Sequence, residues 1–103
     1  MAWLILFAAG LFEIGWAVGL KAAEGRAWVI AVTIGAMVAS VALLYVALRD
    51  LPLGTAYAVW TGIGAVGTVI CGIVLFGESA DAVRLGCIAL IVTGIAGLKL
   101  VTP

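Results

Sequence analysis

Charged residues divide the chain into four long apolar segments. The expected helices cover residues 2–20, 27–48, 54–76 and 83–101, and short charged clusters separate them. A helix needs roughly 17–25 residues to cross the hydrocarbon of a bilayer. The first three segments have this length, and the fourth reaches it when Val83, Arg84 and residues 100–102 are counted at its ends. The pattern predicts an all-α integral membrane protein with four transmembrane helices, in one membrane domain over residues 1–103.

Composition agrees with a membrane protein and excludes several other classes. The chain has 67% hydrophobic and 10% charged residues, and its mean hydropathy is +1.40. A soluble domain of this length leaves too much surface in water to hide so many apolar side chains. The formal net charge is zero and histidine is absent, so we expect no nucleic-acid partner, no metal, no cofactor and no enzyme activity. Cys71 and Cys87 lie in apolar stretches and are interpreted as small hydrophobic residues.

The loop charges are nearly balanced between the two sides of the membrane. Arg49 and Lys99 lie on one side, and Lys21, Arg26 and Arg84 lie on the other. The positive-inside bias, which orients membrane proteins, is therefore almost nil. Such a chain can insert in both orientations, and two antiparallel copies would form the inverted repeat that larger transporters encode in one chain. We expect an antiparallel, dual-topology dimer; the alternative is a single orientation set by other determinants.

Glu13 is the one charge near the middle of a predicted span, since Arg84 and Lys99 stand near the ends of the fourth. It lies near the centre of the first segment, where an ionised side chain costs about 2.5–3.5 kcal/mol on insertion scales. Intramembrane carboxylates face the bundle interior and mark ion or substrate pathways, and desolvation favours the protonated form. We expect Glu13 to bind substrate and proton in turn. The alternative is a neutral structural residue bonded to a neighbouring helix.

Trp16 shares a helix face with this carboxylate, and two other aromatic residues share one face of the third segment. Gly10 and Trp16 stand three residues before and after Glu13, and Tyr57 and Trp60 are also three apart. Residues at this spacing lie on one face of a helix. Gly10 would leave space beside the carboxylate, and the rings would attract a cation where water is excluded. Together they predict a cation pocket, although a single aromatic residue in a membrane helix commonly serves packing.

Other small or polar residues have two interpretations each. The Ser40 hydroxyl would donate either to Glu13 or to the carbonyl four residues earlier in its own helix. Gly62 and Gly64 follow Trp60 and would permit close helix contact or act as a hinge. In the last segment, small residues alternate with branched ones and predict a dimer seam. The residues of this seam are Cys87, Leu90, Ile91 and Gly94.

Two stretches resemble a known family. Residues 54–64 read GTAYAVWTGIG and residues 12–21 read FEIGWAVGLK; with four spans and an early membrane glutamate, they resemble the small multidrug resistance transporters over residues 3–98. Within this family, residues 12–21 resemble the guanidinium-exporter subtype. Trp16 is the marker, because the drug exporters usually carry small residues at this position. Cys87 departs from the family pattern, because a second glycine would be expected at this position of the dimer seam.

The resemblance implies an antiparallel homodimer that exchanges guanidinium for protons across the bacterial inner membrane. It assigns Glu13 to both ions, and it places a substrate pocket around that residue. The pocket residues are Gly10, Trp16, Ser40, Tyr57 and Trp60.

Three other functions remain open. A multidrug exporter of quaternary ammonium or aromatic cations would use the same fold with a looser pocket. A proton-conducting or rotor-type subunit would also carry a lone carboxylate, but it needs only two spans and no aromatic pocket. A non-transporting assembly subunit would leave Glu13 unexplained.

Overall fold

The computed structural model describes residues 1–102, so Pro103, the last residue of the expected domain, lies outside them. The described residues form helices and their connections, and each helix is long and apolar enough to cross a membrane. The prediction of an all-α protein with four transmembrane helices is confirmed. The helices are α1 (Ala2–Ala22), α2 (Ala27–Ala47), α3 (Leu53–Phe76) and α4 (Ala82–Val101).

A tight turn joins α1 to α2. Glu24 and Gly25 both adopt the left-handed conformation, with φ of 47° and 79°. The Arg26 guanidinium then folds back, and it donates to the carbonyl oxygens of Ala22 and Ala23. The last carbonyls of a helix lack the amide partners of a regular helical turn, and a cation there complements the helix dipole. The side chain of Arg26 therefore stabilises the end of α1.

The connection between α3 and α4 uses a glycine and an aspartate. Gly77 ends α3 in the left-handed conformation, with φ of 69°, and the Glu78 amide donates to the Gly72 carbonyl at 3.1 Å. Asp81 caps α4, since its carboxylate accepts from the Arg84 amide at 2.9 Å. Both caps pair backbone groups that a helix end leaves free.

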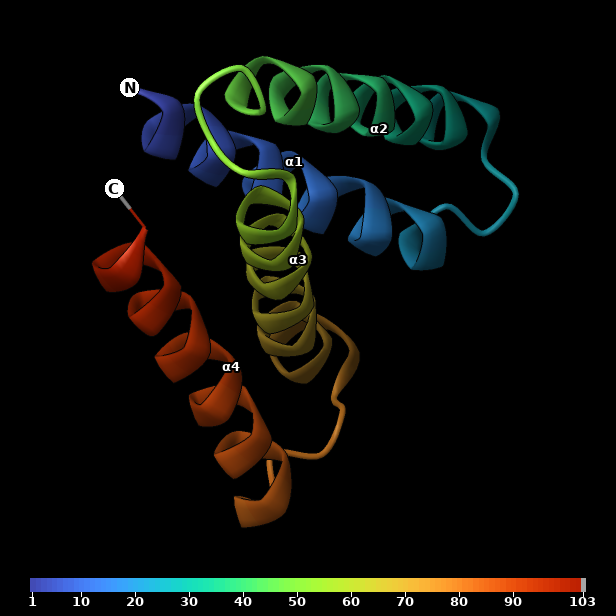
Figure 1. Cartoon of the computed structure of the whole chain (residues 1–103). Coiled ribbons are helices and arrows are strands. Elements are labelled where there is room, and N and C mark those ends of the chain that lie inside the picture. Colours follow the sequence, from blue (N-terminus) through green and yellow to red (C-terminus); the bar gives the residue numbers. More distant parts are fainter. Residues whose placement is uncertain (103) are drawn as a thin grey trace.

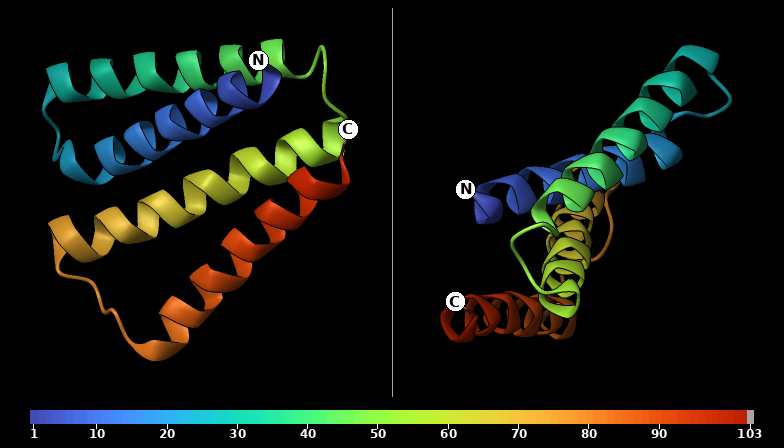
Figure 2. Two further views of the ribbon diagram at one scale, coloured as in Figure 1. Left: turned by 90° about the vertical axis from the view of Figure 1, so that its left-hand side faces the viewer. Right: turned by 45° about the horizontal axis from the view of Figure 1, so that its top comes forward.

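The helices divide into a packed set and an outlying one. Helix α2 lies along α1, and α3 crosses α1 (Figure 1). Helix α4 comes close to α3 only where α3 begins and α4 ends (Figure 2). From there α4 diverges, so that α3 and α4 form a V that is closed where α3 begins and α4 ends (Figure 2). At the closed end the Lys99 ammonium lies 5.0 Å from the centre of the Trp3 ring.

The buried core is small and sits near this closed end. Its members come from α1, α2, α3 and the loop between α2 and α3, and they are Leu6, Ala47, Leu51, Ala56 and Val59. No described residue of α4 is buried. In a membrane, lipid or another protein must cover the exposed side chains of α4.

Candidate functional site

The Glu13 side chain lies against the backbone of α3. Gly64 is buried, and a Cβ atom placed on it would overlap the Glu13 carboxylate and would lie 2.9 Å from the Glu13 Cγ. Glu13 itself is half-buried. Within residues 1–102, no hydrogen bond or ion pair involves its side chain. The carboxylate oxygens are thus held by packing alone and are available to a ligand.

Two linked hydrogen bonds join α1, α2 and α3 about one helical turn from Glu13. Ser40 is completely buried. Its hydroxyl donates to the Ala9 carbonyl at 2.7 Å and accepts from the Trp60 indole N–H at 2.9 Å. Ala9 lies one turn before Glu13, so the bond fixes the part of α1 that carries the carboxylate.

This arrangement differs from both sequence interpretations of Ser40. Its hydroxyl bonds neither to Glu13 nor to the carbonyl four residues earlier in α2. The reason is the close packing of α1 on α2, which brings the Ala9 carbonyl within reach. Thr33 in the same helix does take the local option, since its hydroxyl donates to the Val29 carbonyl at 2.8 Å.

The aromatic residues are brought together only in part. The ring centres of Tyr57 and Trp60 lie 5.6 Å apart and their planes are tilted by 55°. Tyr57 is 55% exposed, so it stands at the surface of a single chain. The Trp16 indole nitrogen is buried and has no partner among the described residues. An unpaired buried donor costs about 1–3 kcal/mol, which indicates that Trp16 has an acceptor in the working protein.

Gly10 occupies a different environment from the one expected. It is buried, and an added Cβ would meet the Ile63 Cβ at 2.8 Å. Ile63 of α3 therefore fills the space that Gly10 was expected to leave beside Glu13. Gly10 instead permits the close approach of α1 and α3.

Some residues of the predicted hinge and dimer seam contact each other within one chain. Helix α3 runs without interruption through Gly62 and Gly64. An added Cβ on Gly62 would meet Ile95 at 2.8 Å and Ile91 at 3.3 Å, so Ile91 packs against α3 of its own chain. The other seam residues, Cys87, Leu90 and Gly94, are exposed, and both roles remain predictions.

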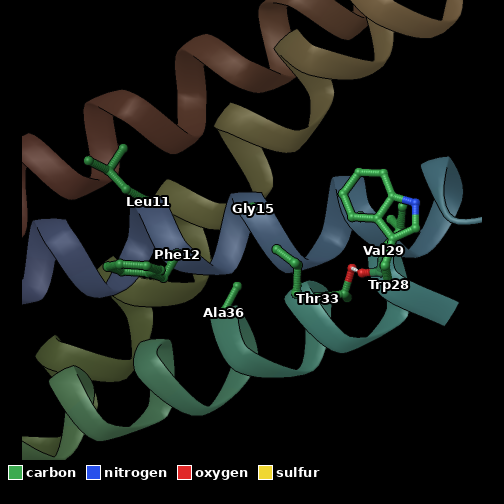
Figure 3. A pocket seen from close by; sticks show the side chains of 9 residues that line it. Leu11, Phe12, Gly15, Trp28, Val29, Thr33 and Ala36 are labelled. Atoms are coloured by element: carbon green, nitrogen blue, oxygen red, sulfur yellow. Dashed lines mark hydrogen bonds between the residues drawn. The ribbon is translucent and has the colours of Figure 1, made fainter.

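A groove of about 490 Å³ lies between α1 and α2, and Glu13 is not among the residues that line it. Figure 3 shows Phe12, Trp28 and Thr33 along it, with the Thr33 hydroxyl turned to the Val29 carbonyl. Its lining contains no charged side chain, so it offers nothing to neutralise a cation. The chemistry of this chain is concentrated at Glu13 instead.

Comparison with known proteins decides the family. Residues 1–91 match the sequence model of the family described as Small Multidrug Resistance protein. The chain belongs to the small multidrug resistance family. It is 60% identical over 104 residues to the guanidinium exporter of Escherichia coli (strain K12), with 99% of each chain covered. It is 59% identical over 102 residues to the guanidinium exporter of Proteus vulgaris, with 97% of this chain and 98% of the relative covered.

These relatives confirm the resemblance found in the sequence. A third relative, the guanidinium exporter of Citrobacter freundii, is 57% identical over 99% of both chains. The relatives are exporters, and the four apolar helices suit a bilayer. This small multidrug resistance protein is therefore a multi-pass protein of the bacterial inner membrane and not an enzyme.

One structural role was missed at the sequence level. Gly64 was considered only as a hinge or a close-contact glycine, yet it is the residue that faces the Glu13 carboxylate. The glycine-rich run of α3 is the only signal for this contact, and it does not single out Gly64 from Gly62 or Gly67.

Proposed function

We propose that this chain exports guanidinium in exchange for protons, and that Glu13 binds the two ions alternately. The observation that carries the proposal is the Glu13 carboxylate, which lies inside a span without a hydrogen bond or ion pair among residues 1–102. Relatives that are 57% and 60% identical over nearly the whole chain are guanidinium exporters. Intramembrane carboxylates of this kind mark ion pathways.

The chemistry of the two ions suits one carboxylate. Guanidinium is planar, and its N–H groups form a fork that pairs with both oxygens of a carboxylate. A proton occupies one of the same oxygens, so the two ions compete for Glu13. If the site can change the side to which it opens only while Glu13 holds a proton or guanidinium, this competition couples guanidinium export to proton entry.

The hydrogen-bonding groups of Trp16, Trp60 and Ser40 limit how each can act on guanidinium. Guanidinium has donors only, so indole N–H groups cannot bind it, although indole faces attract it. The Trp60 N–H is already given to Ser40. The buried Trp16 N–H has no acceptor among the described residues, so Trp16 can offer a cation only the face of its ring. Ser40 is completely buried between the Ala9 carbonyl and the Trp60 N–H, so in this scheme it orients Trp60 and does not itself contact the substrate.

We further propose that two copies work as an antiparallel dimer. The near balance of loop charges supports dual insertion, and the lack of buried residues on α4 supports a partner there. Cys87, Leu90 and Gly94 are the exposed part of the predicted seam. A second copy would supply a second Glu13 to the same pocket.

Transport into liposomes tests the proposal. An imposed pH gradient should drive guanidinium across membranes that contain the purified chain, and Glu13→Gln should abolish the exchange. Tetraphenylphosphonium is the comparison substrate. Transport of this bulky cation without guanidinium transport would favour a multidrug exporter, and unchanged exchange by Glu13→Gln would refute the coupling role.

A further inference from the structure

Three glycines of α3 face three different neighbours. A methyl group on Gly64 would overlap the Glu13 carboxylate, whereas one on Gly67 would overlap Ile14 of α1. On Gly62 the methyl would meet Ile95 of α4 at 2.8 Å. The contact between backbone and carboxylate is therefore specific to Gly64 and does not follow from the glycine-rich composition of the helix.

We infer that Gly64 is a positioning residue for cation binding, because its bare backbone is the support on which the Glu13 carboxylate rests. The inference rests on the proposed function, and it gives Gly64 a role different from that of a hinge. Only glycine leaves room for the carboxylate at this point, since any other residue places its Cβ where the carboxylate lies.

The need for such a support follows from the lack of other restraints on Glu13. No hydrogen bond or ion pair within residues 1–102 holds its side chain, so packing against α3 must define where the carboxylate lies. A long side chain without this support loses more rotamer freedom when it binds a ligand. A fork-shaped cation also requires both oxygens in a fixed orientation. Backbone support at Gly64 supplies that orientation in advance.

The first test compares alanine variants of the three glycines. Misplacement of a binding group by about 1 Å costs on the order of a hundredfold, so Gly64→Ala should raise the KM for guanidinium by roughly ten- to a hundredfold. Gly62→Ala adds the same methyl to the same helix but directs it at α4, and Gly67→Ala crowds α1 without touching the carboxylate. Both controls should raise KM clearly less than Gly64→Ala does, and a hinge role of Gly62 would lower kcat instead. Equal losses in all three variants would overturn the positioning role.

The second test needs no glycine variant and therefore does not depend on how Gly64→Ala folds. In the wild-type protein in lipid nanodiscs, NMR would follow the amide signals of Gly64 and Gly62 as pH is changed. The Gly64 signal should move with the same midpoint as proton-competed guanidinium binding, and the movement at Gly62 should be much smaller. A Gly64 amide signal that does not shift with pH would overturn the inference.

The outcomes separate this inference from the proposed function. If the wild-type protein neither binds nor transports guanidinium, or if Glu13→Gln transports it equally well, the proposed function fails. The NMR titration still reports whether the carboxylate touches Gly64 in that case. If transport requires Glu13 but Gly64→Ala behaves like Gly62→Ala, the positioning role alone fails.

Discussion

Removal of the Ser40 hydroxyl tests the bond chain that holds three helices together. Ser40→Ala deletes two hydrogen bonds, the 2.7 Å donation to the Ala9 carbonyl and the 2.9 Å donation from the Trp60 indole. Hydrogen bonds between membrane helices average about 0.6 kcal/mol and reach about 1.7. The two bonds therefore predict a loss of roughly 1–3 kcal/mol in the free energy of unfolding. The upper part of this range applies if the Trp60 N–H finds no new acceptor.

Matched variants show whether the loss of stability comes from the bonds between helices or from removing any hydroxyl. Thr93→Val removes a hydroxyl that donates at 2.7 Å to the Ala89 carbonyl of its own helix, so it should leave stability nearly unchanged. Trp60→Phe removes the indole donor together with part of a ring that packs on the core, so it should cost at least half as much as Ser40→Ala. The double variant of Ser40 and Trp60 should cost less than the sum of the single changes, because the two residues share one bond.

The assay is reversible unfolding in mixed micelles of dodecylmaltoside and SDS at a fixed protein concentration. A fixed concentration is needed because association contributes to the apparent stability. Guanidinium transport by Ser40→Ala should also weaken, since the Ala9 bond fixes the turn that precedes Glu13. If Ser40→Ala is no less stable than Thr93→Val, the bond chain does not join the helices and the reasoning is refuted.

Two further predictions concern the loops. Glu24 has a left-handed φ of 47°, so Glu24→Gly should stabilise the protein by about 1 kcal/mol; the thermal midpoint should rise, whereas Gly25→Ala should lower it. Hydrogen bonds from the Arg84 amide and the Ser79 hydroxyl lower the pKa of the exposed Asp81. A lowered pKa stabilises the fold above the unfolded value of about 3.9 and loses this effect as pH falls through the folded pKa. Thermal midpoints below pH 4 should fall more steeply for the wild type than for Asp81→Asn, and parallel curves would contradict the cap.

The sequence alone determined the number of transmembrane helices and identified Glu13 as the charge in the middle of a span. Both are local properties, because a bilayer requires about 20 apolar residues per span and penalises any charge within one. Glu13 stands out for that reason by its position in the chain alone. Trp60 and Tyr57 were paired correctly as well, since residues three apart on a helix lie on one face.

Only the tertiary structure decided which groups meet around Glu13. It paired Ser40 with the Ala9 carbonyl, filled the space beside Gly10 with Ile63, and set the carboxylate against Gly64. These contacts depend on how each helix is rotated and where two helices cross. Membrane helices are apolar on all sides, because lipid and protein are equally apolar neighbours. The hydrophobic pattern therefore carries no information about rotation, and close packing at small residues sets it instead.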